Sequence, residues 1–338
     1  MKEHPFLTLA IETSCDETAA AVLSAGRTAL SNVISSQIDI HRTFGGVVPE
    51  IASRRHLEQI NLVVDQALAE AGVGFDDVDL IGVTQGPGLV GALLIGLSTA
   101  KAYALALGRP IVGVHHIKAH ICAAYIEHAD LEPPFLALVV SGGHTDLVRV
   151  CGCDAYEVLG RTRDDAVGEA FDKVARALGL PYPGGPAIDR IARDGDPKAV
   201  AFKRVFLEKD SLDFSFSGVK TGVLNHLNTE RQAGRSVNVA HIAASFQESV
   251  TEVLVAKTLR AAALCGETKV VMAGGVAANS RLRAAMSEAC RDKGLRLYRP
   301  SPLLCTDNAA MVGAAAYRKY KERGADDLSL DAFPNLAL

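Results

Sequence analysis

The alternation of apolar and polar positions predicts two successive structural units of the same kind. In the first unit, apolar runs of four to seven residues predict strands, and longer stretches with apolar positions three and four apart predict helices. The predicted elements are strands at 6–11, 19–23 and 29–35, a helix at 49–72, a strand at 80–84, a helix at 91–107 and a strand at 111–114. Three strands therefore come first, and helix and strand alternate afterwards.

The second half of the chain repeats this order. Its predicted elements are strands at 135–140, 145–150 and 155–160, helices at 165–178 and 239–264, a strand at 269–273, a helix at 279–293, a strand at 296–298 and a helix at 308–321. The stretch 181–236 is rich in glycine, proline and charge and is predicted as an insertion. We expect an N-terminal domain at 1–134 and a C-terminal domain at 135–338.

A duplicated α/β unit with a hairpin at the front of each half is how the actin, Hsp70 and sugar-kinase group is built. That RNase H-like architecture binds its nucleotide in a cleft between the two halves. Element order alone leaves a two-domain Rossmann-like protein open.

Composition places the chain among soluble globular proteins. It has 338 residues, of which 49% are hydrophobic and 22% charged, enough for two cores. The most apolar stretch, 89–108, contains Ser98, Thr99 and Lys101, so a buried helix is expected rather than a membrane span.

The start of the chain lacks a signal-peptide pattern, and seven cysteines without a Cys-x-x-Cys pair fit reduced thiols. A cytoplasmic protein without membrane association is expected.

The net charge of −4 limits how this chain can meet nucleic acid. Neutralising phosphates requires clustered Lys and Arg, so a protein whose whole surface binds RNA is excluded. Any RNA contact must be local or shared with a partner.

Two glycine turns follow buried strands in the second half. In the first, Val139 and Val140 lead into Ser141, Gly142 and Gly143, whose bare backbone N–H groups can form an anion nest. An ordinary hairpin turn is an equal alternative. In the second, Gly274 and Gly275 precede Asn279, which either caps a helix or binds a ligand. Taken together, the two turns favour nucleotide binding over either structural alternative.

A metal site is suggested by His116 and His120, which stand four apart in a segment predicted to be helical. A satisfied surface pair of histidines is the alternative. Asp307, at a loop-to-helix junction, is a candidate third ligand. Two histidines and one carboxylate suit iron or zinc with open coordination positions.

Further carboxylates lie in turns or near glycines. Asp16 and Glu17 stand at the tip of the first hairpin, where either could act as a general base, although turns favour Asp for structural reasons alone. Asp172, and Asp189 just after Gly185, are weaker candidates for binding ligand hydroxyls.

Ten ordered motifs span nearly the whole chain. They are IETSCDET at 11–18, GGVVPE at 45–50, GPGLVGAL at 86–93, the HxxxH of 116–120, VSGGHT at 140–145, GEAFDK at 168–173, YPGGP at 182–186, DFSFSG at 213–218, AGGVAAN at 273–279 and CTDNAAM at 305–311. Together these motifs resemble the tRNA N6-adenosine threonylcarbamoyltransferase family, formerly called O-sialoglycoprotein endopeptidases.

The resemblance implies transfer of a threonylcarbamoyl group from threonylcarbamoyl-adenylate to N6 of the adenosine next to the anticodon of tRNAs that read ANN codons. It implies one metal ion, iron before zinc, held by His116, His120 and Asp307, and roles for Asp16 and Glu17 in activity. The implied ligand set for the adenylate or ATP is Val139, Val140, Ser141, Gly142, Gly143, Asp172, Gly185, Asp189 and Asn279. The implied partners are tRNA, a shorter actin-like paralogue and a small ATPase.

Three rival functions remain to be weighed. A metallopeptidase would need the glutamate of an HExxH helix, which the sequence at 116–120 lacks. A nucleotide-gated interaction module of the Hsp70 type, or a sugar or acetate kinase, would leave the two histidines and Asp307 without a purpose.

Overall fold

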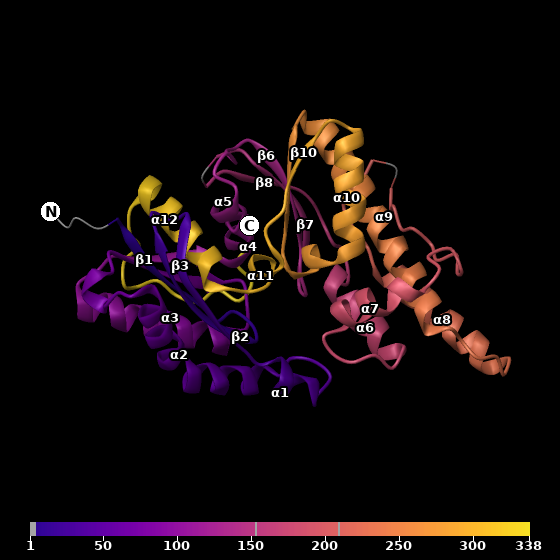
Figure 1. Cartoon of the computed structure of the whole chain (residues 1–338), viewed down its shortest axis with the longest axis horizontal. Helices are drawn as coiled ribbons and strands as arrows, with labels where there is room; N and C mark the ends of the chain where they lie inside the picture. Colours follow the sequence, from indigo (N-terminus) through magenta and orange to yellow (C-terminus); the bar gives the residue numbers. More distant parts are fainter. Residues whose placement is uncertain (1–4, 153, 209) are drawn as a thin grey trace. The chain divides into compact units, whose positions relative to one another are not determined.

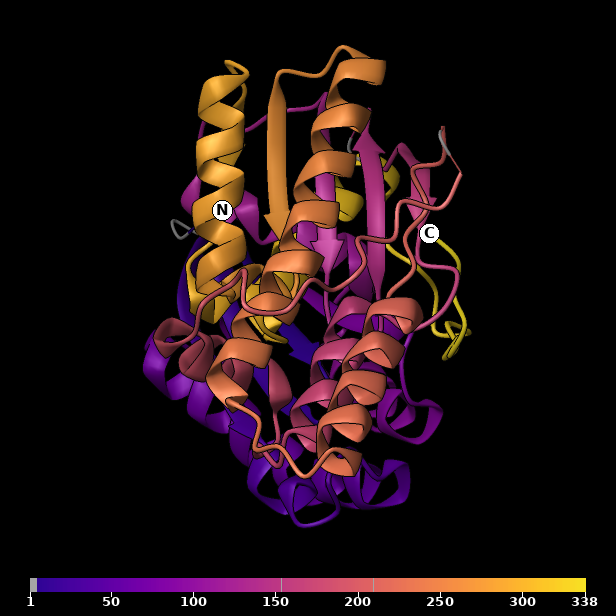
Figure 2. The same ribbon diagram turned by 90° about the vertical axis from the view of Figure 1, so that its right-hand side faces the viewer.

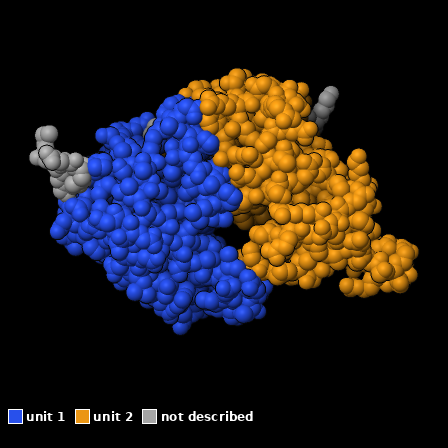
Figure 3. All heavy atoms as spheres, in the orientation of Figure 1, with its two compact units in different colours: residues 1–132, 300–338 blue, residues 133–299 orange. Residues whose placement is uncertain are grey.

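The computed structural model describes residues 5–152, 154–208 and 210–338. The chain forms two compact units, shown in Figure 3. Unit 1 consists of residues 1–132 and 300–338, and unit 2 of residues 133–299.

Unit 1 is built on a five-stranded mixed sheet with the order β3-β2-β1-β4-β5. Its strands are β1 (Leu7–Glu12), β2 (Glu17–Ser24), β3 (Thr28–Ser36), β4 (Leu80–Gly86) and β5 (Ile111–His115). The first three are antiparallel, and β4 and β5 run parallel to β1. Its helices are α1 (Ile38–Arg42), α2 (Pro49–Ala71), η1 (Phe75–Asp77), α3 (Val90–Leu107), α4 (His116–Cys122), α5 (Ala124–Glu127), α11 (Pro302–Cys305) and α12 (Ala309–Arg323), several of them labelled in Figure 1.

Unit 2 repeats this plan, with the sheet order β10-β9-β6-β7-β8. Its strands are β6 (Phe135–Val140), β7 (Thr145–Val150), β8 (Tyr156–Arg161), β9 (Lys269–Ala273) and β10 (Arg296–Tyr298). Its helices are α6 (Val167–Ala177), α7 (Gly184–Ile191), η2 (Ala192–Asp194), α8 (Ser217–Gln232), α9 (Val239–Cys265), η3 (Gly275–Ala278) and α10 (Ser280–Asp292). Figure 2 shows α9 and α10 lying over a face of this sheet. In both units three antiparallel strands precede two parallel ones, which confirms the predicted duplication.

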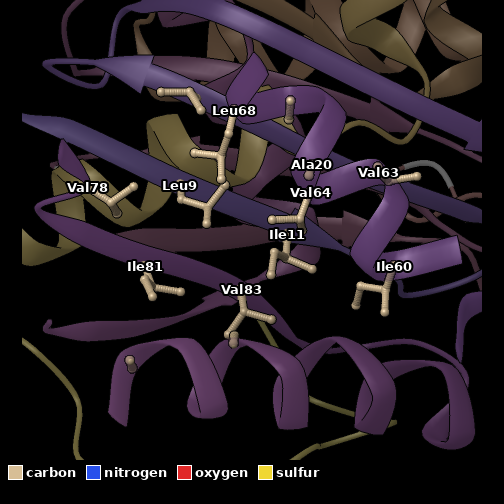
Figure 4. Close-up of a cluster of buried hydrophobic side chains, with 14 of the residues drawn as sticks. Leu9, Ile11, Ala20, Ile60, Val63, Val64, Leu68, Val78, Ile81 and Val83 are labelled. Atoms are coloured by element: carbon tan, nitrogen blue, oxygen red, sulfur yellow. The ribbon is translucent and has the colours of Figure 1, made fainter. Parts of the chain in front are cut away.

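The core of unit 1 follows from strand alternation. Leu9 and Ile11 point to one face of β1, where they pack with Ile60 and Val64 of α2 and Val83 of β4 (Figure 4). Each such side chain contributes about 1.5–3 kcal/mol when it is fully buried. The face that binds α2 and α3 is therefore the more strongly apolar one.

The opposite face of this sheet packs against α12, whose buried side is mostly alanine and glycine, with Met311 and Val312 among them. A Cβ on Gly82 would lie 2.6 Å from Ala316 Cβ, and one on Gly313 would lie 2.5 Å from Leu23 Cδ1. Only small residues permit so close an approach of helix and sheet.

This packing differs from the predicted domain assignment, which placed 300–338 in the C-terminal domain. The segment instead packs within unit 1, because α12 contacts β1, β2 and β4. The stretch 181–236, predicted as an insertion, contains α7, η2 and α8.

Helix α3 is long and apolar enough to cross a membrane by length and composition, with a mean hydropathy of 1.6. Its residues Leu97, Ala100 and Ala104 belong to the unit 1 core cluster. It is therefore a helix of the folded core, as the sequence predicts.

Candidate metal centre and ligand-binding turns

Unit 1 brings the three predicted metal ligands together. His116 opens α4 directly after β5, His120 follows one helical turn later, and Asp307 stands just before α12. Asp307 Oδ1 lies 3.1 Å from His120 Nε2 and 3.6 Å from His116 Nε2. One ligand atom from each residue lies within 4.8 Å of the others. This spacing allows a single ion to contact all three.

The hydrogen bonding of these side chains fits a metal. His120 is 1% exposed, and among the described residues neither of its ring nitrogens has a hydrogen-bond partner. Its Nε2 lies 3.1 Å from Asp307 Oδ1, but the two groups lack hydrogen-bond alignment. A buried polar group left unpaired costs roughly 1–3 kcal/mol, a penalty that coordination would remove. The donor set of two imidazoles and one carboxylate suits iron or zinc.

The charges around the centre favour a cation. Burial alone would lower the pKa of His116, but the negative charges of Asp307 and Glu12 outweigh it and raise that pKa to about 9. Burial, with the charges of Asp16 and Asp307, raises the pKa of Glu17 well above its usual value. Carboxylates thus converge on this region from both ends of the β1–β2 turn and from Asp307.

The β1–β2 turn itself is held by a histidine that sequence reasoning missed. His56 of α2 is buried; its Nε2 lies 3.0 Å from the Cys15 carbonyl oxygen, and its Nδ1 lies 2.8 Å from Thr18 Oγ1. A carbonyl only accepts, so Nε2 carries the proton and Nδ1 accepts from the threonine hydroxyl. Burial lowers the pKa of His56, which favours this neutral form. His56 therefore fixes the turn that carries Asp16, which is 8% exposed.

A signal for His56 was present in the sequence. Ala52, His56 and Ile60 stand four apart and share the buried side of α2. Glu12, a charged residue at the end of an apolar strand, is the second residue that was not singled out. The Oε2 atom of Glu12 lies 3.1 Å from Nδ1 of His116.

The β6–β7 turn in unit 2 is the predicted anion nest. Val139 and Val140 are fully buried, so only their backbone can face a ligand. Gly142 and Gly143 are exposed, a Cβ at either would meet nothing within 4 Å, and neither backbone lies in the left-handed region. Neither packing nor conformation of the protein itself therefore requires glycine there, whereas a ligand against the backbone would.

Neighbouring elements pack closely against this turn. A Cβ on Gly168, in the first turn of α6, would lie 2.6 Å from the Ser141 carbonyl oxygen. Gly274 has φ of 88°, and its Cβ would lie 2.4 Å from the Val140 carbonyl oxygen. The start of α6 and the second predicted glycine turn therefore both contact the end of β6.

The polar candidate residues of unit 2, Asp172, Asp189 and Asn279, form hydrogen bonds at the N-termini of helices. Asp172 Oδ1 accepts from Gly184 N at 2.7 Å at the start of α7, and Asp189 Oδ1 accepts from Ser280 Oγ at 2.7 Å at the start of α10. Asn279 Oδ1 accepts from Leu282 N at 3.0 Å, and its Nδ2 donates to Gln247 at 2.8 Å. The capping alternative for Asn279 is thus present. Gly185 borders open space, because a Cβ added to it would have no atom within 4 Å.

Two sheets of matching order, each with a front hairpin, define the class: a duplicated α/β protein of the actin-like fold. The fold is similar to that of nucleotide-bound full-length HypF, with a TM-score of 0.61 and 16% identity, covering 96% of this chain and 47% of that one. It is also similar to (R)-2-hydroxyglutaryl-CoA dehydratase component A of Acidaminococcus fermentans, with a TM-score of 0.55 and 16% identity, covering 94% and 98%. These likenesses establish the fold alone.

Closer relatives establish the family. The chain is 56% identical over 332 residues to a tRNA N6-adenosine threonylcarbamoyltransferase of Clostridioides difficile, covering 98% of both chains. It is 57% identical over 330 residues to one of Clostridium beijerinckii, covering 98% of this chain and 97% of that one. The family model for TsaD, tRNA N6-adenosine threonylcarbamoyltransferase, matches residues 28–314. The chain belongs to this family, and the resemblance drawn from its motifs is confirmed.

Proposed function

We propose that this chain transfers the threonylcarbamoyl group of threonylcarbamoyl-adenylate to N6 of the adenosine next to the anticodon of tRNAs that read ANN codons. The adenosine amine attacks the carbamoyl carbon and forms the new C–N bond. The bond from that carbon to the adenylate oxygen breaks, AMP leaves with the electron pair, and the amine proton passes to a base. The observation that best supports this function is that His116, His120 and Asp307 lie close together in a member of this family.

A metal ion is the cofactor we propose for this cluster, with iron before zinc. When bound, it would supply Lewis acidity that polarises and orients the carbamoyl group. The chain's own contribution is to keep the three ligands in place, His116 and His120 on one helix and Asp307 beside it.

Asp16 and Glu17 are the proposed proton acceptors. Asp16 precedes β2 and Glu17 is its first residue. Burial, with the charges of Asp16 and Asp307, raises the pKa of Glu17, and this interaction with Asp307 supports a role beside the metal ligands. A raised pKa makes a carboxylate a stronger base, closer in proton affinity to the group it must deprotonate.

Adenylate or ATP binding is the proposed role of the unit 2 residues. In the Ser141–Gly143 turn, the N–H groups of Gly142 and Gly143 would bind phosphate oxygens and stabilise negative charge as it develops, while the Ser141 N–H donates to the His144 carbonyl oxygen. Asp172, Gly185, Asp189 and Asn279 would complete the ligand site, with Val139 and Val140 contributing backbone. A carboxylate has about four acceptor positions, so an Asp that accepts one helix hydrogen bond can also bind a ligand hydroxyl.

A shorter actin-like paralogue and a small ATPase are the proposed protein partners, in the cytoplasm and without a membrane. The outer side of α3 supports a protein contact, because Val90, Leu94 and Leu105 are exposed there, Leu105 by 71%. Leu57 on the neighbouring α2 is 65% exposed. Exposed apolar side chains on two helices that pack together favour association with a partner. A shared complex also fits the net charge of −4, because the RNA contact need not come from this chain alone.

The test is transfer of labelled threonine to unmodified tRNA in the presence of ATP, bicarbonate, the adenylate-forming enzyme and the partner proteins. Label that requires this chain, and that is lost with Asp16→Asn or Glu17→Gln while adenylate still binds, would support the function and the base assignment. No label from a chain that binds adenylate, beside a working transferase of the same family, would contradict the function. Label retained in both variants would remove only the base assignment.

A further inference from the structure

Glu12 is a buried carboxylate that contacts a proposed metal ligand without being one. It ends β1 and is 0% exposed. Its Oε2 lies 3.1 Å from Nδ1 of His116, whereas the metal-facing atom of that ring, Nε2, is directed to Asp307. Glu12 therefore touches the side of the imidazole that points away from the cluster.

Three donors fix the Glu12 carboxylate. Oε1 accepts from the Ser14 backbone N–H at 2.5 Å, and Oε2 accepts from Thr84 Oγ1 at 2.7 Å as well as facing His116. Thr84 lies on β4, which pairs with β1 in parallel register. The position of the carboxylate is thus set by the sheet and by the β1–β2 turn.

A metal binds only the neutral form of His116, and in that form the contact decides which ring nitrogen carries the proton. A carboxylate only accepts, so a neutral His116 beside it holds its proton on Nδ1. The other neighbour of Nδ1, Ser14 Oγ at 3.2 Å, can accept from the same N–H. Nε2 is then left with a lone pair, the form that binds a metal.

We propose that Glu12 is a positioning residue for the metal centre, one that holds His116 in the Nδ1-protonated form with Nε2 directed at the ion. The inference rests on the metal site of the proposed function. His120 provides the contrast, because among the described residues its Nδ1 has no hydrogen-bond partner. The two ligands are therefore anchored unequally, and His116 is the one whose orientation is built into the sheet.

Glu12→Gln is the sharpest variant, because it keeps the shape and changes only the pattern of donors. If the amide NH₂ takes the place of Oε1, it faces the Ser14 N–H, donor against donor. If it takes the place of Oε2, it donates to His116 Nδ1 and moves the ring proton to Nε2, which then cannot bind a metal. Either orientation disturbs the site, whereas Thr84→Val keeps the carboxylate and removes one hydroxyl.

The experiment measures Zn²⁺ affinity by competition with a chromophoric chelator, after thermal unfolding has shown that the metal-free variants are folded. We expect Glu12→Gln to bind Zn²⁺ about 10–100-fold more weakly than the unaltered chain. Thr84→Val should change the affinity by less than about threefold, because the carboxylate remains. Equal affinity of folded Glu12→Gln and unaltered chain would overturn the inference and leave the metal site intact. Failure of the unaltered chain to bind Zn²⁺ would overturn the metal site itself.

A second measurement covers the case in which Glu12→Gln does not fold. Nitrogen NMR of the unaltered, zinc-loaded chain with labelled histidine, assigned with His116→Gln, reports the protonation of each ring nitrogen. A protonated Nδ1 and a metal-bound Nε2 on His116 are expected. An unprotonated or metal-bound Nδ1 would contradict the role of Glu12.

Discussion

The front hairpins of the two units occupy the same place in sheets of the same order, yet they are built for different chemistry. The β1–β2 turn of unit 1 is packed and anchored by side chains: a Cβ on Gly88 would lie 2.6 Å from the Ser14 carbonyl oxygen, and Thr13 Oγ1 donates to Ala92 at 2.9 Å. The β6–β7 turn of unit 2 is open above Gly142 and Gly143. One duplicated turn thus presents carboxylates next to the candidate metal ligands, and the other presents bare backbone.

This contrast has a measurable consequence. In unit 1 the proposed reactive groups are side chains, so substitutions there should change metal binding and transfer. In unit 2 the side chains support helix starts and the exposed backbone is the proposed ligand site, so substitutions should separate effects on stability from effects on ligand affinity.

The largest effect is expected for His120→Ala in unit 1. The variant removes a buried ligand, and the affinity for Zn²⁺ should fall by at least about 100-fold, with transfer lost in parallel. Isothermal titration and the labelled-threonine assay measure the two effects. His226→Ala, on α8 of unit 2, is the matched histidine control and should leave both unchanged. Full Zn²⁺ affinity in His120→Ala would show that the cluster is not the metal site.

Asn279→Ala should lower stability in unit 2. It removes a helix cap worth about 1 kcal/mol and leaves the Gln247 amide without its buried donor, so the free energy of unfolding should fall by roughly 2–3 kcal/mol. Urea unfolding measures the loss. Asn225→Ala, at an exposed position of α8, should cost less than about 0.5 kcal/mol. A loss no greater than that of the control would mean that Asn279 is not a structural support.

Gly142→Val tests whether the exposed backbone of the β6–β7 turn contributes to ligand binding. The added side chain meets no protein atom but would occupy ligand space, so adenylate affinity should fall by about 10-fold or more while stability changes by less than about 0.5 kcal/mol. Equilibrium binding of a non-hydrolysable adenylate analogue provides the measurement. Gly222→Ala, where the new Cβ would make an ordinary 3.7 Å contact with Phe202, is the control. Unchanged affinity in folded Gly142→Val would remove the turn from the ligand site.

The smallest effect concerns Asp146, next to the open turn. Burial raises its pKa to about 6, although Arg161 opposes the shift. The folded state therefore holds this proton more tightly than the unfolded chain, and stability falls as the pH rises from about 4 to 6. Asp146→Asn should remove this loss and be more stable than the unaltered chain by roughly 1–2 kcal/mol at pH 8, with little difference at pH 4. Parallel pH dependence of unfolding in both proteins would show that Asp146 does not titrate in this way.

Much of the fold could be predicted because its elements carry strong local patterns. The buried strands β1 and β6 and the helices α2 and α9 are visible as apolar periodicity. The position of α12 could not be predicted, because its alanines and glycines specify close packing but not the sheet that they contact. Element order placed it in the wrong half.

The candidate site shows the same limit. Residue type and spacing suggested His116, His120 and Asp307 while leaving a surface pair of histidines as the alternative, and the family resemblance implied all three as ligands. Glu12 and His56 acquire their roles from partners far away in the sequence, 104 and 41 residues distant. Those pairings exist only in the folded unit, so the helical spacing of His56 could indicate its burial but not its partners.

The most direct test of the central claim, that the histidine and aspartate cluster of unit 1 holds a metal required for transfer, is removal and restoration of the metal. The chain is stripped with a chelator, its metal content is measured, and transfer of labelled threonine to tRNA is compared before stripping, after it, and after iron or zinc is returned. We predict that transfer disappears with the metal and returns with it in the unaltered chain, and that it does not return in Asp307→Ala. Transfer at the original rate by a fully stripped chain would contradict the account.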